Sequence, residues 1–266
     1  MTASERLARG LMWFSAFVVV VFLMTPLLVT VAVSFGSSSV FTLPPPDWSL
    51  RWYQRLADER GLLPALLISL QVAALATAVA MILGTLCAIA VVRARFPGRD
   101  SILTFLVSPL MLPGLVIGIA MLQGFKAMGL RDIYGSLIIA HVVITLPFVV
   151  RTVVGALSLF DFSLIDAART LGYSYPAALL RVLVPSLGPA FLTSGMFAFL
   201  ASVENYPISI FFTDAWTKTL PIQVLQYVDE HPDPTIAAIS AGMVLLAILA
   251  LIVGDRLVGL RKLAEF

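Results

Sequence analysis

The chain has 266 residues, of which 60% are hydrophobic and only 12% are charged, and its formal net charge is +2 at pH 7. Soluble domains carry about 25% charged residues, so this composition excludes a soluble globular protein and predicts an integral membrane protein. The single cysteine, Cys87, excludes an internal disulfide, and no group of Cys and His residues has the spacing of zinc ligands. We expect no metal site, no cofactor and no nucleic-acid partner.

Apolar stretches long enough to cross a bilayer recur along the chain, since a spanning helix needs ~20 mostly apolar residues. The first stretch exceeds the ~7 to 15 apolar residues of a signal peptide, so we expect it to be retained as a membrane anchor. The sequence predicts one all-α domain, residues 1–266, whose six transmembrane helices lie at residues 12–35, 62–92, 102–123, 134–157, 187–210 and 235–254.

The distribution of Lys and Arg predicts which side of the membrane the termini face. Six spans place both termini on one side. If that side is the cytoplasm, it receives eleven of the 17 Lys and Arg residues, as the positive-inside rule favours. The expected location is therefore the bacterial inner (cytoplasmic) membrane, with the N- and C-termini cytoplasmic and residues 211–234 outside.

After the first span, residues 49–56 form an amphipathic stretch in which Arg51 and Arg55 alternate with Trp52 and Tyr53. Such a pattern predicts a helix that lies at the outer membrane interface. We interpret its aromatic residues as an interface anchor.

The connection at residues 158–186 predicts two short helices. Ser163 is placed to cap the first helix, with Asp166 as its capping-box partner three residues later. Gly172 suits the left-handed residue that ends a helix. The second helix is expected to end at Pro185. We therefore predict a cytoplasmic helix-turn-helix between two membrane spans.

The first of these helices carries apolar residues that water does not favour. The large Leu164 and Ile165 precede the small Ala167 and Ala168. A docking helix uses large residues as knobs and small ones to let another backbone approach. Alternatively, these residues pack against the cytoplasmic ends of the protein's own spans. Spacing alone leaves both interpretations open.

Two segments resemble a known family. The run Asp166-Ala-Ala-x3-Gly172-x9-Val-Leu-Val-Pro185 resembles the Glu-Ala-Ala-x3-Gly-x9-Ile-x-Leu-Pro loop of ABC importer permeases. Residues 202–213, together with the Pro-Pro-x-x-Ser-Leu-Arg-Trp-Tyr segment at residues 45–53, are similar to the second permease of spermidine/putrescine-type importers. The loop differs from the family pattern by conservative changes, and its spacing is intact.

In that family the loop forms a coupling helix that seats in a groove of the ATPase subunit. The resemblance implies a type I ABC importer permease fold. Its partners would be a second permease in a heterodimer, two ATP-binding cassette subunits and a periplasmic or extracellular solute-binding protein. The solute would be polyamine-like, or another small amine, amino-acid-like or aminophosphonate compound. ATPase coupling is assigned to Leu164, Ile165, Asp166, Ala167, Ala168, Gly172 and Pro185.

The fifth predicted span contains an acidic residue, Glu204. A carboxylate at bilayer depth costs ~2.5 to 3.5 kcal/mol, so it should face a cavity or a partner. The following Tyr206-Pro207 should interrupt the helix, and interrupted helices often line translocation sites. We interpret Glu204, Asn205 and Tyr206 as lining a translocation pathway. Alternatively, Glu204 lies near the outer surface or pairs with an Arg of the second permease.

The sequence has no motif for binding ATP and few acidic residues within its spans, and both features bear on how transport is powered. None of its three lysines follows a glycine, so it cannot complete a Gly-x4-Gly-Lys-[Ser/Thr] phosphate loop, and ATP hydrolysis is expected on partner subunits. His141 and His231 are interpreted as structural, and no catalytic set is found. The alternative is a proton- or ion-coupled secondary transporter, which would carry several intramembrane acids, whereas Glu204 is nearly alone.

Overall fold

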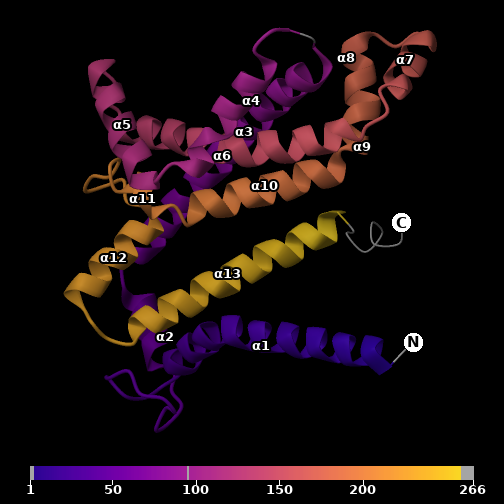
Figure 1. Cartoon of the computed structure of the whole chain (residues 1–266). Coiled ribbons are helices and arrows are strands. Elements are labelled where there is room, and N and C mark those ends of the chain that lie inside the picture. The colour runs from indigo at the N-terminus through magenta and orange to yellow at the C-terminus, as the bar shows by residue number, and fades with distance from the viewer. Residues whose placement is uncertain (1–2, 95, 259–266) are drawn as a thin grey trace. The chain divides into compact units, whose positions relative to one another are not determined.

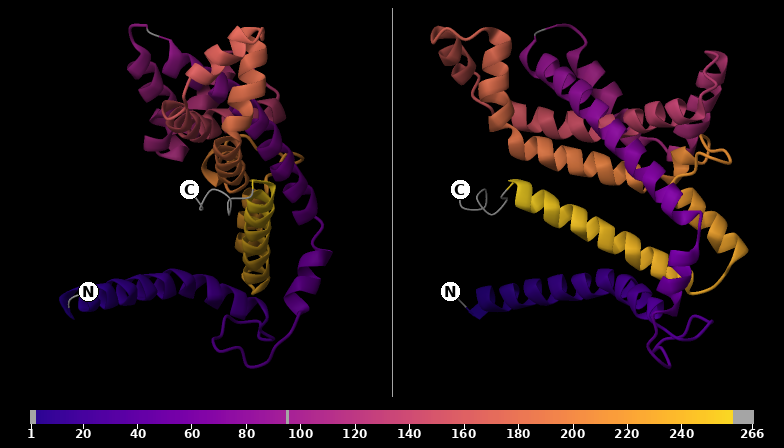
Figure 2. Two further views of the ribbon diagram at one scale, coloured as in Figure 1. Left: turned by 90° about the vertical axis from the view of Figure 1, so that its right-hand side faces the viewer. Right: turned by 180° about the vertical axis from the view of Figure 1, so that it is seen from behind.

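The computed structural model of the chain describes residues 3–94 and 96–258, and over these residues the only β pairing is an isolated bridge between Gly36 and Trp48. The all-α prediction is confirmed. The chain divides into two compact units, whose helices can be followed in Figure 1 and Figure 2. The first combines Met1–Arg60 with Val224–Leu246, and the second combines Gly61–Gln223 with Ala247–Phe266.

The first unit is organised around Trp52. Its helices are α1 (Ala3–Ser34), α2 (Arg51–Asp58) and the beginning of α13 (Thr235–Val258). Trp52 is 1% exposed, and its indole N–H donates to the carbonyl of Gly36 at 2.7 Å. The predicted amphipathic helix is confirmed. The anchor interpretation is wrong for Trp52, because its ring and its N–H are both satisfied inside the unit.

An ion pair within the same unit joins distant parts of the sequence. Arg55 on α2 places Nη1 3.1 Å from Oδ2 of Asp233. The other carboxylate oxygen of Asp233 accepts the N–H of Thr235 at 2.9 Å. One carboxylate therefore both holds α2 and satisfies an amide at the start of α13.

The second unit is built on three long helices that pack together: α3 (Leu62–Arg93), α6 (Ile133–Ser158) and α10 (Gly188–Val203). Small residues line the buried face of α3, where a Cβ on Gly84 would lie 2.8 Å from Cγ1 of Val149 on α6. Small residues let apolar helices approach closely. The remaining elements are α4 (Arg99–Val107), η1 (Ser108–Met111), α5 (Gly114–Ala127), α7 (Ser163–Thr170), α8 (Tyr175–Ala178), η2 (Leu179–Leu183), α9 (Val184–Ser186), α11 (Tyr206–Ser209) and α12 (Leu220–Glu230), in which the chain passes into the first unit.

Among the described residues, four helices are singly long and apolar enough to cross a membrane: Leu7–Ser34, Leu62–Arg93, Ile133–Ser158 and Thr235–Val253. The count reaches six only if two bent pairs each form one span. Arg99–Met111 and Gly114–Ala127 meet at 112°, and Tyr175–Ser186 and Gly188–Val203 meet at 73°.

The span predicted at residues 102–123 is therefore not one continuous helix, whereas the span predicted at residues 187–210 contains the interruption that was expected there. Leu112 is extended, with φ −97° and ψ 144°, because the residue before a proline is pushed out of the helical region by the ring of Pro113. In the later segment, α10 ends at Val203 and a separate short helix, α11, follows it.

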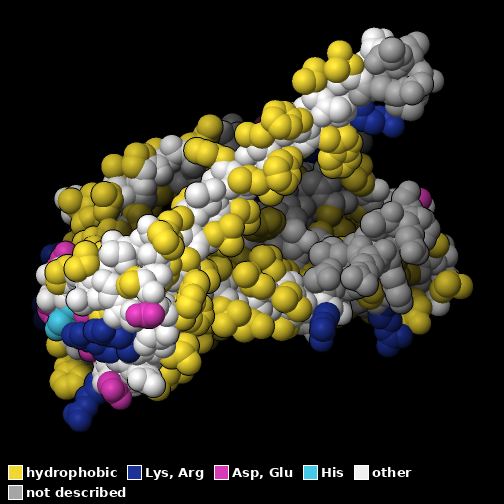
Figure 3. Space-filling view, turned by 90° about the horizontal axis from the view of Figure 1, so that it is seen from below, with side chains coloured by type: hydrophobic (Ala, Val, Ile, Leu, Met, Phe, Trp, Pro, Cys, Tyr) yellow, Lys and Arg dark blue, Asp and Glu magenta, His cyan; other side chains and the backbone are white. Residues whose placement is uncertain are grey.

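Large apolar side chains remain on the outside of the helices. On α1, Phe14, Phe17 and Phe22 are 66%, 65% and 75% exposed, and Figure 3 shows hydrophobic side chains spread over one face of the molecule. A surface of this kind is stable against lipid or against another subunit rather than against water.

Candidate functional site

The segment from α7 to α9 is a helical hairpin, called the hairpin below. Its turn is set by Gly172, which has φ +94°. The N–H of Gly172 donates to the carbonyl of Arg169 at 3.0 Å, and that of Tyr173 donates to Ala168 at 3.2 Å. This pair of hydrogen bonds is a Schellman motif, which satisfies the last carbonyls of α7. The predicted role of Gly172 as a left-handed helix terminator is confirmed.

The beginning of α7 differs from the prediction, because Ser163 is not its cap. Ser163 is already helical, and its own N–H donates to Oδ1 of Asp161 at 2.9 Å. This backbone hydrogen bond holds the pKa of Asp161 below its ordinary value, since it favours the ionised carboxylate. Asp166 does not complete a capping box either. It forms an ion pair with Arg93, at 3.7 Å.

The end of the hairpin also differs, because Pro185 does not close it. Pro185 lies inside α9, which runs on to Ser186 before the bend at Leu187. The turn before it, η2, is a π-helix whose last bond joins the N–H of Val184 to the carbonyl of Leu179. A wide π turn gives the chain a way to accommodate the missing N–H of a proline.

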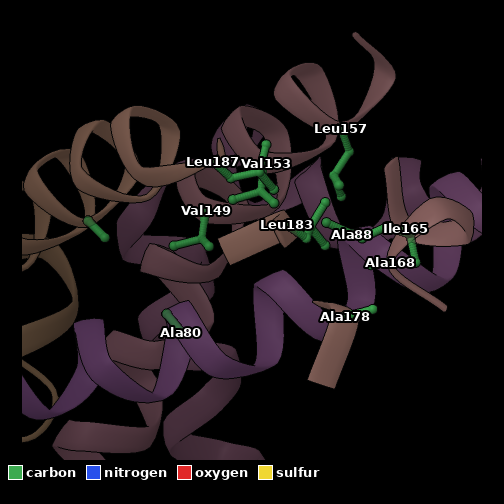
Figure 4. Packing of buried hydrophobic residues seen from close by; sticks show 11 residues of the cluster. Ala80, Ala88, Val149, Val153, Leu157, Ile165, Ala168, Ala178, Leu183 and Leu187 are labelled. Atoms are coloured by element: carbon green, nitrogen blue, oxygen red, sulfur yellow. The ribbon is translucent and has the colours of Figure 1, made fainter. Parts of the chain in front are cut away.

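The predicted coupling residues divide between two faces of α7. Ile165 is fully buried and Ala168 is 7% exposed, and Figure 4 shows both with Ala88 of α3 and Leu183 of the same buried cluster. The interpretation that the hairpin packs against the protein's own helices is correct for these two. Leu164, Asp166 and Ala167 lie on the exposed side.

Arg93, at the C-terminal end of α3, holds the hairpin in place. Its guanidinium carbon is 5.2 Å from the ring centroid of Phe162 and 5.1 Å from that of Tyr175, in addition to its ion pair with Asp166. Both distances are within cation–π range. Sequence reasoning did not find this role, because the partners of Arg93 lie far along the chain.

The other candidate site is the helix break, formed by Glu204 and Asn205 between α10 and α11. Asn205 is extended, and its Oδ1 accepts the N–H of Ile208 at 3.0 Å, which caps α11 with Pro207 in the first turn. The predicted interruption is confirmed. Glu204 is exposed, and none of the ion pairs among the described residues involves it. Tyr206 is half-buried.

The break packs against two glycines of α5. A Cβ on Gly114 would lie 2.9 Å from Cβ of Pro207, and one on Gly118 would overlap the ring of Phe211 and lie 3.1 Å from the carbonyl oxygen of Pro207. Two glycines four residues apart lie on one face of a helix and admit another backbone at close range. This pairing of α5 with α11 was not predicted.

The two histidines lie in different surroundings. His141 on α6 is 1% exposed, with Nδ1 2.7 Å from Oγ of Ser202 and Nε2 3.1 Å from Oγ of Ser209. His231 stacks on Tyr227 with ring centroids 5.0 Å apart. Over the described part of the chain, no group of three or more His, Cys, Asp or Glu residues could hold a metal ion.

Membrane helices broken near polar residues are common in transport proteins. Residues 80–260 match the family described as the binding-protein-dependent transport system inner membrane component, and the chain belongs to this family. It is a multi-pass permease subunit of a binding-protein-dependent ABC importer in the inner membrane.

Curated relatives match most of the chain. It is 31% identical over 242 residues to the spermidine/putrescine transport system permease protein PotC of Haemophilus influenzae, covering 91% of this chain and 93% of PotC. It is 32% identical over 226 residues to the putrescine transport system permease protein PotI of Escherichia coli, with 82% and 80% covered. A sulfoquinovosyl glycerol permease, SmoH of Agrobacterium fabrum, is 27% identical over 85% of this chain and 82% of SmoH.

Solved structures share the fold. A bacterial ABC transporter involved in alginate import matches with a TM-score of 0.70 and 15% identity, over 97% of this chain and 98% of that chain. The MetNI methionine ABC transporter matches with a TM-score of 0.58 and 19% identity, over 75% and 93%. Both support the permease fold.

Proposed function

We propose that this chain is one of two different permease subunits in an importer of a small polyamine-like cation. The observation that carries the proposal is the similarity to PotC, a permease named for spermidine and putrescine transport, over 91% of this chain and 93% of PotC. PotI, named for putrescine, is similar at the same level of identity. A soluble binding protein would deliver the solute, and two ATP-binding cassette subunits would supply the energy.

In this proposal, the bent pair of α4–η1 and α5 forms one span and α10 with α11 forms another, so six spans cross the inner membrane with both termini in the cytoplasm. The positive-inside distribution supports this orientation. It puts the hairpin in the cytoplasm and the loop from Phe211 to Thr219 outside. Labelling of a cysteine at Thr217 in a Cys87→Ala background, with a reagent that does not cross membranes, should therefore succeed in intact cells.

The hairpin is proposed to couple the permease to an ATPase subunit. Its exposed face, with Leu164, Asp166 and Ala167, is available for a partner, whereas Ile165 and Ala168 join the hairpin to the core. A movement of the ATPase subunit can be transmitted to the membrane helices through α7, because this short helix would contact the ATPase subunit on one side and α3 on the other.

The helix break is proposed to line the solute path. Glu204 supports this role because its carboxylate is exposed at an interruption and has no ion-pair partner among the described residues. A carboxylate can form charge-assisted hydrogen bonds with the ammonium groups of a polyamine. Asn205 supports the site differently, since its side-chain oxygen is used to cap α11.

The test is transport by the complete complex in vesicles with its binding protein. Glu204→Gln keeps the shape and removes the charge, so putrescine uptake should fall by about tenfold, the effect of losing one charge-assisted hydrogen bond, while assembly and binding-protein-stimulated ATP hydrolysis persist. Glu230→Gln, a change at another exposed carboxylate, is the matched control. Full uptake by Glu204→Gln would remove Glu204 from the path, and failure to assemble would favour an ion pair with the second permease.

A further inference from the structure

A buried hydrogen-bond chain connects α6 to both sides of the helix break. His141 lies on α6, Ser202 is in the last turn of α10, and Ser209 is the last residue of α11. All three are between 1% and 3% exposed. Nδ1 of His141 is 2.7 Å from Oγ of Ser202, and Nε2 is 3.1 Å from Oγ of Ser209. One imidazole ring therefore holds the residues that precede and follow Glu204.

The other hydrogen bond of Ser209 determines which atoms donate and which accept in this series of hydrogen bonds. The hydroxyl of Ser209 donates its single hydrogen to the carbonyl of Asn205 at 2.5 Å. Its oxygen must therefore accept from the N–H at Nε2 of His141. The neutral ring then has Nδ1 free to accept from the hydroxyl of Ser202. The hydrogen bonds thus run in one direction from the end of α10, through the ring, to the backbone of the break.

This arrangement holds the residue at which the helix is interrupted. Asn205 leaves the helical region, with φ −77° and ψ 94°, so the direction of α11 relative to α10 depends on what holds that residue. Ser209 binds its carbonyl, and His141 holds Ser209. Polar groups buried away from water are costly to leave unpaired, so the three hydrogen bonds favour one geometry of the break over others.

We infer that His141 is a positioning residue, which sets the geometry of the helix break and thereby the direction in which the Glu204 side chain is presented. Its effect on solute selectivity rests on the proposed function, but its effect on the break does not. His141 is buried and acts only through the two serines, so it does not touch the solute. A change at His141 or Ser209 should alter access to position 204 before it alters folding.

The experiment measures access directly. In the purified complex with Cys87→Ala and Glu204→Cys, the rate of reaction with a small cationic thiol reagent is compared with and without Ser209→Ala, which deletes one hydroxyl. We expect the rate to change by about tenfold, the scale of one lost buried hydrogen bond. The matched control is Ser194→Ala, because Ser194 is a fully buried serine of α10 that bonds the carbonyl of Phe191 in its own helix.

A second pair of variants separates positioning from a general loss of packing. His141→Gln retains one acceptor and one donor, so its labelling rate should stay closer to that of the parent than the rate of His141→Leu does. Equal rates for Ser209→Ala, Ser194→Ala and the parent would overturn the inference, and so would a parent whose cysteine does not react at all. Full transport by Glu204→Gln would instead remove the pathway proposal and leave the labelling result standing.

Discussion

The hairpin and the helix break are held by different chemistry. Besides apolar packing, each makes polar contacts with one side chain of a long helix, Arg93 for the hairpin and His141 for the break. The side chain of Arg93 is 33% exposed and uses its charge, with one carboxylate and two aromatic rings as partners. His141 is 1% exposed and uses hydrogen bonds to two hydroxyls. A charge costs little free energy near water and much more in the interior. The partly exposed position therefore suits a charged arginine, and the buried position suits a neutral, hydrogen-bonded histidine.

The largest effect is expected where the hairpin meets the core. Ala168→Trp places a large ring into a packed cluster, and overpacking costs about 1 to 3 kcal/mol. Ala167→Trp places the same ring on the exposed face. We expect the first change to lower the thermal stability of the purified permease, and the second to spare stability while reducing co-purification of the ATPase subunit. If both lowered stability equally, the division of α7 into an inner and an outer face would be wrong.

Removing the charge of Arg93 should destabilise the protein less, and only within the hairpin. Arg93→Gln deletes two cation–π contacts, each worth about 0.5 to 1 kcal/mol at exposed sites, so hydrogen exchange of α7 amides should become roughly 5- to 30-fold faster. Arg181→Gln is the control, because Arg181 contacts the ring of Tyr173 beyond the turn. Unchanged exchange in Arg93→Gln would show that apolar packing alone holds the hairpin.

The smallest effect concerns Asp161, whose pKa is lowered by the backbone N–H of Ser163. A carboxyl group with a depressed pKa in the folded state contributes stability above its unfolded pKa, and the contribution is lost as the pH falls through the folded pKa. Asp161→Ala should therefore lower the thermal midpoint slightly at neutral pH. The difference from the parent should be constant down to about pH 4 and vanish below it. A difference that vanished near neutral pH would assign it to another group.

The same contrast explains how much could be predicted from the sequence. The uninterrupted spans α3 and α6 follow from long apolar runs, because hydrophobicity and length are sufficient to define them. The turn at Gly172 and the interruption before Pro207 were predicted from local backbone chemistry. The bend at Pro113 was missed because apolar composition continues through it.

The contacts of Arg93 and His141 could not be predicted, because each joins residues that meet only after the helices pack. Arg93 contacts Asp166 and the aromatic rings of Phe162 and Tyr175, which follow it by about 70 to 80 residues. His141 contacts Ser202 and Ser209, which follow it by 61 and 68 residues. Spacing along the chain contains no signal for such pairs. A histidine inside an apolar span does indicate that buried polar partners exist, but it does not identify them.

The discontinuity of the first unit has a consequence for biosynthesis. Its core residue Trp52 and the ion-pairing Arg55 are translated early, whereas Asp233 follows only after residues 61–223. At about 5 to 20 residues per second, that interval lasts on the order of 10 s. During this time Arg55 lacks the carboxylate that it pairs with in the folded unit, that of Asp233. The ion pair between Arg55 and Asp233 can therefore form only after the second unit's long helices have been synthesised, although the contacts of Trp52 with Gly36 need no later residue.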